Sequence, residues 1–323
     1  MTSLGYNSLM SSVVAVDIGG THIRAALYES GSLTPLRHQR IRSEALLPGI
    51  YDRLVQTIQA VWPSQGGVTS IGIASPGPLD PFRGVILDTP NIPEWHDFPL
   101  AEKLGERFQA PVHLDNDANL AALGEWKYGA GQGHQDLLYL TISTGIGGGV
   151  ICSGRLLQGF HGLAAELGHV TIDPQGPLCS CGFPGHLESF SSGPAIARFV
   201  NEQIAQGAKS TLQAGADLSA KHIAEAAQAG DTLARAAFAR AGEYLGIGVA
   251  NYLHIFDPSI VIFGGGVSQV GELIFVPFEE SLRRRVFHPR YLEKLVITRA
   301  DLGDDVGLMG ALALARLSEV APT

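Results

Sequence analysis

Two cysteines and two histidines lie close together in and near "GPLCSCGFPGHLE" (residues 176–188), a stretch rich in glycine and proline. Cys179 and Cys181 are two of only three cysteines in the chain, His169 precedes them and His186 follows. Thiolate and imidazole groups bind structural Zn²⁺, and four such ligands form a tetrahedral site. The C-x-C spacing is tighter than the usual C-x₂-C, so two inert thiols beside unrelated histidines remain an alternative to a zinc site.

Two glycine-rich turns each join a pair of apolar runs. In "VDIGGT" the carboxylate of Asp17 precedes Gly19, Gly20 and Thr21, and "STGIGGG" (residues 143–149) is the second turn. Glycine lets backbone N–H groups approach a phosphate closely, and Mg²⁺ would explain a carboxylate beside that phosphate. Neither turn has the P-loop or Rossmann pattern. Their joint occurrence, with a third cluster in "FGGGVS", favours phosphate binding over two ordinary hairpin turns.

The segment "LDNDAN" places two carboxylates, Asp115 and Asp117, where an expected strand is followed by an expected helix. A carboxylate at such a junction can accept a proton from a reacting hydroxyl group. Asp and Asn are also common helix N-caps. The residues alone leave both interpretations open.

The elements that must position these residues alternate between strand and helix. Apolar runs predict strand-turn-strand units at residues 13–29 and 136–154, further strands at 70–77, 111–117 and 259–268, and helices at 51–62, 99–108, 118–129, 193–207, 219–255 and 307–317. This alternation predicts an α/β fold with two lobes, and the repeated strand-turn-strand unit predicts a duplicated architecture.

Composition limits the classes of protein to which the chain can belong. Of its 323 residues 45% are hydrophobic and 16% charged, which is typical of a globular protein. The net charge of -9 argues against a nucleic-acid partner. No apolar run reaches the roughly 20 residues of a membrane helix, no signal peptide is evident, and the few cysteines fit a reducing compartment. We therefore expect a soluble, cytoplasmic protein without a membrane partner, with Cys152 in its core.

Six motifs in order resemble one family. The motifs are "VDIGGTHIRAALYE", "LDNDANLAALGEWKYGAG", "TISTGIGGGVI", "AAELGHV", "CSCGFPGHLE" and "IFGGGVS". Together they resemble the ROK family of repressors and sugar kinases over Val13 to Leu317, and "GEWKYGAG" and "PNIPEW" are most similar to its bacterial glucokinases. The resemblance implies a two-lobed actin-like ATPase (ribonuclease H-like) fold and ATP-dependent phosphorylation of a hexose.

The resemblance also implies roles for single residues. Asp117 is the base that accepts the hydroxyl proton, and Asn116 beside it holds the sugar. The other expected sugar-binding residues are Pro76, Gly77, Asn91, Glu166, His169 and Glu188. ATP, with Mg²⁺, is expected at Asp17, Gly19, Gly20, Thr21, Thr144, Gly145, Gly147, Gly264, Gly265 and Gly266.

The sequence departs from the family pattern at two positions that bear on these sites. The family binds zinc with one histidine and three cysteines in "CxCGxxGC", and His186 occupies the third cysteine position here. Imidazole is a competent zinc ligand, so we expect a structural zinc at His169, Cys179, Cys181 and His186. His22 occupies the position after "GGT" where the family usually has lysine.

The expected organisation is a disordered lead-in at residues 1–12, a smaller lobe at 13–127 to which a helix at 305–319 returns, and a larger lobe at 128–304 with the zinc loop. The favoured reaction converts glucose to glucose 6-phosphate, although kinases for N-acetylglucosamine, N-acetylmannosamine, fructose and allose share these motifs. A sugar-sensing ROK regulator is another possibility, but "DIGG" begins at residue 17, which leaves no room for its DNA-binding domain. A homodimer or homotetramer is usual in the family.

Overall fold

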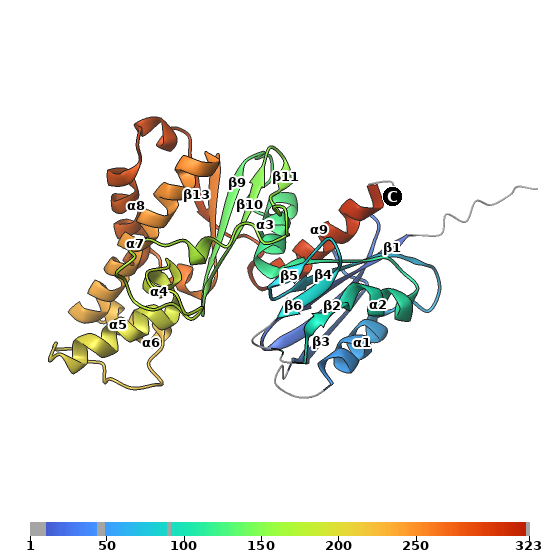
Figure 1. Ribbon diagram of the computed structural model, residues 1–323, viewed down its shortest axis with the longest axis horizontal. Helices are drawn as coiled ribbons and strands as arrows, with labels where there is room; N and C mark the ends of the chain where they lie inside the picture. The colour runs from blue at the N-terminus through green and yellow to red at the C-terminus, as the bar shows by residue number, and fades with distance from the viewer. Residues whose placement is uncertain (1–10, 44–48, 89–91, 93, 321–323) are drawn as a thin grey trace, which may run out of the picture. The chain divides into compact units, whose positions relative to one another are not determined.

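A computed structural model describes residues 11–43, 49–88, 92 and 94–320 of the chain. The chain divides into two compact units (Figure 1). Unit 1 comprises residues 1–132, 158–164 and 302–323, and unit 2 comprises residues 133–157 and 165–301. The short segment 158–164 is therefore in unit 1, whereas the sequence placed it in the larger lobe. Of the expected lead-in, residues 1–10 lie outside the described residues, and Ser12 already begins the first strand.

Unit 1 is built on a five-stranded sheet. Its strands, in spatial order, are β3 (Arg37–Arg42), β2 (His22–Glu29), β1 (Ser12–Ile18), β4 (Val68–Ser75) and β8 (Val112–Asn116). The first three pair antiparallel, and β4 and β8 continue the sheet in parallel. A small second sheet consists of β5 (Leu79–Asp80), β6 (Val85–Asp88) and β7 (His96–Phe98).

Unit 2 repeats this strand arrangement. Its sheet has the order β11 (Arg155–Leu156), β10 (Ile146–Cys152), β9 (Leu137–Ile142), β12 (Ile260–Gly264) and β13 (Val296–Arg299). Again the first three strands are antiparallel, and the last two are parallel to the strand that precedes them in this order. The predicted duplication is confirmed: β1–β2 and β9–β10 are equivalent hairpins, each closed by one of the glycine-rich turns.

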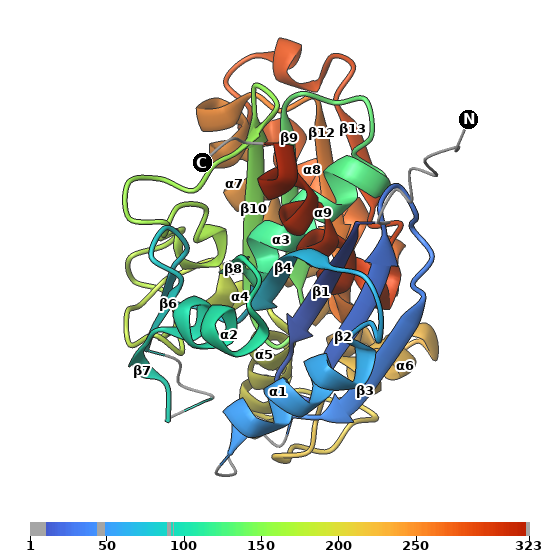
Figure 2. The same ribbon diagram turned by 90° about the vertical axis from the view of Figure 1, so that its right-hand side faces the viewer.

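Helices cover both faces of the unit 1 sheet because the side chains of its central strand alternate. Val14 and Val16 of β1 pack with α1 (Ile50–Val61) and α2 (Leu100–Phe108), which lie on the near face in Figure 2. Val13 and Ala15 point the other way, toward α3 (Asp117–Tyr128) and α9 (Val306–Val320). Helix α9 thus closes the core of unit 1, although it is the last element of the chain.

One apolar core fills unit 2. The helices that contribute to it or flank it are α4 (Glu188–Ser191), α5 (Gly193–Ala205), α6 (Ala220–Gln228), α7 (Thr232–Phe256) and α8 (Glu272–Arg285). Short 3₁₀ turns connect them to the strands: η1 (Leu167–His169), η2 (Gly266–Val270) and η3 (Pro289–Leu292) in unit 2, with η4 (Gly303–Asp305) before α9 in unit 1.

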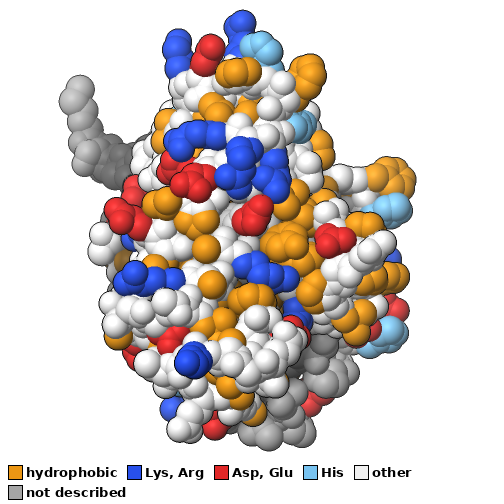
Figure 3. All heavy atoms as spheres, turned by 90° about the vertical axis from the view of Figure 1, so that its left-hand side faces the viewer, with side chains coloured by type: hydrophobic (Ala, Val, Ile, Leu, Met, Phe, Trp, Pro, Cys, Tyr) orange, Lys and Arg blue, Asp and Glu red, His pale blue; other side chains and the backbone are white. Residues whose placement is uncertain are grey.

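The surface carries charges of both signs. Figure 3 shows basic side chains next to acidic ones on the face that includes α7 and α8. Ion pairs there join Arg283 to Glu279, and Arg284 and Arg285 to Glu243. Within the described part of the chain, no helix combines the length and the apolar character needed to cross a bilayer.

The expectation that Cys152 lies in the core is wrong. Cys152 is exposed to solvent. Cys152 is the last residue of β10, and Ser153 directly after it has a positive φ of 49° in the turn to β11. The apolar run therefore ends at the point where the strand leaves the core.

Candidate active site

The glycine turn of unit 1 borders a small pocket of about 270 Å³. Residues on both sides of the turn line it: Asp17, Gly19, Gly20, Thr21, His22, Arg24, Arg40 and Asp304. The four residues that the sequence assigned to the phosphate turn are therefore together. The pocket lies entirely within unit 1.

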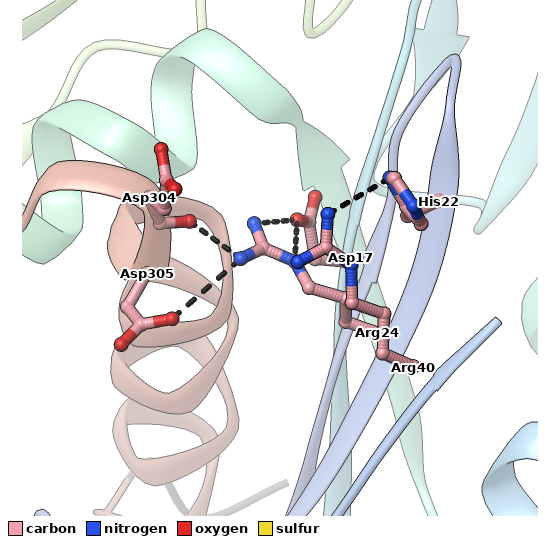
Figure 4. Close-up of polar contacts among 6 residues, drawn as sticks. All are labelled: Asp17, His22, Arg24, Arg40, Asp304 and Asp305. Carbon is pink, nitrogen blue, oxygen red and sulfur yellow. Dashed lines mark hydrogen bonds and ion pairs between the residues drawn. The ribbon is translucent and has the colours of Figure 1, made fainter. Parts of the chain in front are cut away.

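An ion pair occupies the inner side of this pocket (Figure 4). Arg24 donates from Nε (3.0 Å) and Nη2 (2.5 Å) to Oδ2 of Asp17, and Nη1 donates to the carbonyl of Asp304 at 2.5 Å. Asp305 lies 3.6 Å from the same guanidinium group. Burial raises the pKa of Asp17, and the charge and hydrogen bonds of Arg24 offset part of that effect. Arg24 thus compensates a buried carboxylate and connects β2 to the start of α9.

The end of β8 brings a second group of predicted residues together. Because β4 and β8 are parallel neighbours, Ser75 is paired with Asn116, and the residues after both strands meet at one edge of the sheet. Gly77 lies so close to Asn116 that a Cβ atom would be 3.0 Å from its Nδ2. Pro76, Gly77, Asn116 and Asp117 are therefore neighbours, whereas Asn91 lies outside the described residues.

The three polar residues at this edge differ in their surroundings. Asn116 is the N-cap of α3 and accepts from the amides of Ala118 and Asn119. Asp115 is fully buried and accepts from the amide of Asn116 and from the side chains of Asn119 and Gln158. Asp117, the first residue of the helix, is exposed, and its Oδ1 accepts from the next amide at 2.8 Å. Capping is thus the task of Asn116, and Asp117 is the carboxylate that solvent and ligands can reach.

In unit 2 a pocket of about 930 Å³ lies beside the second glycine turn. Thr144 and Gly266 line it, together with residues of α5, α6 and η2. Gly145, Gly147, Gly264 and Gly265 are not among its lining residues. Gly265 has φ +82°, and a Cβ there would be 2.3 Å from the carbonyl of Ile142, so only glycine fits where β12 ends. The walls are mainly apolar, which suits a flat aromatic group.

The segment that carries Glu166 and His169 is packed tightly on β10. A Cβ at Gly168 would be 1.9 Å from the carbonyl of Ile146, so η1 can approach the strand this closely only with glycine there. The hydroxyl of Tyr252 from α7 donates to the carbonyl of Leu167. This packing fixes the positions of Glu166, which precedes η1, and of His169, which ends it.

Glu188 connects three parts of this region. Its Oε2 accepts from the amide of Ile146 at 2.9 Å, and its Oε1 accepts from Ser180 at 2.8 Å and Cys179 at 3.5 Å. Loss of solvation raises the pKa of Glu166, the charge of His169 opposes this, and the charge of Glu188 adds to it. Glu166, His169 and Glu188 thus form one electrostatic group in unit 2, and Glu188 also holds the cysteine loop.

The four predicted zinc ligands are together in the same unit. One potential ligand atom from each of His169, Cys179, Cys181 and His186 lies within 4.8 Å of all the others. Sγ of Cys181 is 3.2 Å from Nδ1 of His186, and Sγ of Cys179 is 3.8 Å from Nδ1 of His169. Ligands at about 2.0–2.3 Å from a tetrahedral Zn²⁺ would be roughly 3.3–3.8 Å apart, so the donor set fits that ion.

Comparison with known proteins identifies the family of this chain. A sequence model described as the ROK family matches residues 13–317. The chain belongs to the ROK family. A glucokinase of Thermotoga maritima is 38% identical over 94% of this chain and 97% of its own length. A xylose repressor of Caldicellulosiruptor bescii is 31% identical, and the chain spans 96% of its own length and 79% of that protein.

A solved ROK structure shows the same fold. The ROK glucokinase of Streptomyces griseus, crystallised with glucose and AMPPNP, is 35% identical, with 95% of this chain and 99% of that chain covered at a TM-score of 0.77. The expected actin-like ATPase fold and membership of the ROK family are therefore confirmed.

Two residues beside Asp17, Arg24 and Asp304, were not identified from the sequence. Arg24 could have been found, because the symmetric register of the β1–β2 hairpin pairs it directly with Asp17. Asp304 could not, because 280 residues separate it from Arg24. Only the tertiary packing of α9 brings it there.

Proposed function

We propose that this ROK protein transfers the γ-phosphoryl group of ATP to a hydroxyl group of a hexose, with glucose as the preferred acceptor and glucose 6-phosphate as the product. The observation that carries the proposal is the exposed carboxylate of Asp117 beside an N-cap supplied by Asn116. The names of the relatives support it, since a glucokinase is 38% identical over nearly the whole chain.

Asp117 is proposed as the general base. Phosphoryl transfer needs mainly positioning and charge neutralisation, and a carboxylate that accepts the hydroxyl proton as the new P–O bond forms. Asn116 and the Pro76–Gly77 turn adjoin Asp117 and would orient the sugar in unit 1. From unit 2, the proposed sugar ligands are Glu166, His169 and Glu188, whose carboxylate and imidazole groups suit adjacent hydroxyl groups.

Each glycine turn is proposed to contribute to nucleotide binding within its own unit. The apolar walls of the pocket beside Thr144 and Gly266 suit an adenine ring, and the Gly19–Thr21 turn suits phosphate oxygens. Asp17 offers the hard oxygen donors that Mg²⁺ prefers, and Arg24 engages only its Oδ2, so the residues present fit the ion. When bound, Mg²⁺ would neutralise charge on the transferred phosphoryl group.

The Cys₂His₂ cluster is proposed to hold a structural Zn²⁺. Burial raises the pKa of the Cys179 thiol, so metal binding must displace a proton there. Burial and the neighbouring His169 lower the pKa of His186, which favours the neutral imidazole that binds metals. The metal would fix a loop rich in glycine and proline, and with it Glu188 and His169.

A coupled assay of ADP release tests the proposal. The purified protein is given ATP, Mg²⁺ and each of five sugars: glucose, N-acetylglucosamine, N-acetylmannosamine, fructose and allose. We expect the highest kcat/KM with glucose. A higher value with another sugar would correct the acceptor, and ADP release with none of them would contradict the kinase. A DNA mobility-shift assay on the same sample tests the regulator alternative suggested by the 31% identical repressor.

A further inference from the structure

Strand β3 concentrates positive charge in an acidic chain. The net charge is -9, yet the six residues of β3, "RHQRIR", include three arginines and one histidine. Ile41 packs toward the apolar core shared with α1, so Arg40 and Arg42, its neighbours in an alternating strand, point to the opposite face. On that face the register places Arg40 beside Arg24 and Arg42 beside His22. This is also the face of the Asp17 pocket.

Arg40 and His22 take no part in the Asp17 ion pair. Arg24 bonds to Asp17 and to the carbonyl of Asp304. Arg40 is exposed, and its Nη2 donates a hydrogen bond to Nδ1 of His22 at 3.1 Å (Figure 4). Both Arg40 and His22 line the pocket of about 270 Å³ that contains the Gly19–Thr21 turn. Arg40 therefore presents positive charge to whatever the turn binds, and the His22 imidazole, whose Nδ1 accepts from Arg40, lies beside it.

The pKa of His22 reflects the same concentration of positive charge. Loss of solvation, and then the charges of Arg40, Arg42 and Arg24, lower the pKa of His22. An anion placed among these groups would relieve that repulsion. The local charge therefore favours a phosphate-bearing ligand.

Ser43, directly after β3, holds the turn in place. Its Oγ donates to the carbonyl of Gly20 at 2.7 Å, and its amide donates to the carbonyl of Thr21 at 2.9 Å. The carbonyl of Ser43 in turn accepts from Nη2 of Arg53 at 2.7 Å. Ser43 is completely buried. Among the residues that the structure describes, no acceptor is recorded for the amides of Gly20 and Thr21. With its carbonyls held by Ser43, the turn keeps these two N–H groups available to a ligand.

We propose that β3 completes the donor site: Arg40 and His22 contact the terminal phosphates of the nucleoside triphosphate, and Ser43 is a positioning residue that orients the amides of the turn. This rests on the proposed kinase function and extends it to residues to which the family resemblance assigned no role. Arginine suits this role because its planar donors match phosphate oxygens, and histidine adds a second donor at the same pocket.

Calorimetric titration with AMPPNP and with adenosine tests the contact role. Arg40→Gln should weaken AMPPNP binding about tenfold, the effect of one lost charge-assisted hydrogen bond, and leave adenosine binding unchanged. Arg37→Gln is the matched control. It removes the same charge from the same strand, but Arg37 lies on the opposite face, where it donates to the carbonyl of Trp62. It should bind AMPPNP as the wild type does.

Kinetics test the positioning role. Ser43→Ala should lower kcat/KM for ATP about three- to tenfold with unchanged adenosine affinity, and Ser43→Thr, which retains the hydroxyl group, should restore it. Ser70→Ala is the control: Ser70 is also buried in unit 1, and its Oγ has no hydrogen-bond partner among the described residues. Thermal melting of each variant shows whether it is folded.

The outcomes separate this inference from the function on which it rests. Equal AMPPNP affinity of Arg40→Gln and the wild type would overturn the contact role while the kinase stands. Full activity of a folded Ser43→Ala would overturn the positioning role. A wild-type protein that neither binds AMPPNP nor phosphorylates a sugar would overturn the proposed function itself, and this inference with it.

Discussion

Three consecutive polar side chains at the junction of β8 and α3 have three different tasks. Asp115 is buried and accepts hydrogen bonds from Asn119 and Gln158. Asn116 caps the helix, and Asp117 is exposed at the first position of the helix. Asp and Asn are nearly equivalent as caps, so their chemistry alone cannot assign these tasks. The residue at which the helix begins decides them: Asn116 directly before it accepts from two amides of the first turn, whereas Asp117 within the helix accepts from the next amide.

The zinc cluster gives a prediction for single residues. Purified without a histidine tag, the protein should contain about one zinc per chain by elemental analysis, and Cys179→Ser should lose it, because a hydroxyl group does not replace a thiolate ligand. Cys152→Ser is the matched control, since this exposed cysteine lies outside the cluster. Active protein with almost no zinc, or a Cys179→Ser variant with wild-type zinc content, would refute the site.

At the scale of elements, the long helix α7 depends on its N-cap. Asp231 accepts from the amide of Ala234 at 2.9 Å, and its Oδ2 accepts from Ser210 (2.8 Å) and from the amide (2.6 Å) and hydroxyl group (2.8 Å) of Thr211. Burial raises its pKa, but these hydrogen bonds outweigh burial and hold the pKa of Asp231 well below its usual range. One carboxylate thus begins α7 and fixes the loop before α6.

Asp231→Ala should therefore lower the stability of unit 2 by about 1–2 kcal/mol, seen as a lower midpoint of urea denaturation at pH 7. Because the folded pKa is depressed, the stabilisation by the charge is fully present above the unfolded pKa of about 3.9 and is lost as the pH falls below it. Asp231→Asn keeps an acceptor oxygen but has no charge to titrate. The difference in the free energy of unfolding between the wild type and Asp231→Asn should consequently become smaller as the pH falls. A difference that becomes larger would contradict this account.

At the scale of the whole molecule, the sequence predicted the parts of the fold that apolar periodicity encodes. The two hairpins, the strands β4, β8 and β12 and the helices α1, α2, α3, α5, α6, α7 and α9 follow from it, whereas α4 and α8 were not predicted. Strand β3 was not predicted, because only one of its six residues is apolar. It is a strand because the edge of β2 offers it hydrogen bonds, which is a property of the sheet and not of the segment.

The same limit applies to the candidate site. Glycine and carboxylate motifs predicted which residues lie at each turn. Contacts made by tertiary packing were not predictable: Asp304 beside Arg24, Ser43 beneath the glycine turn, and Gln158 on Asp115. Gln158 belongs to segment 158–164, which lies in unit 1 despite its place in the sequence.

The most direct test of the proposed mechanism is the turnover number of Asp117→Asn with saturating glucose and ATP. The amide is nearly isosteric with the carboxylate but cannot accept the hydroxyl proton, so we expect kcat to fall by about 10²–10⁴-fold. AMPPNP affinity and the melting temperature should stay close to those of the wild type. A folded Asp117→Asn that turns over glucose at a rate near the wild-type value would show that another group takes the proton, and would contradict the account.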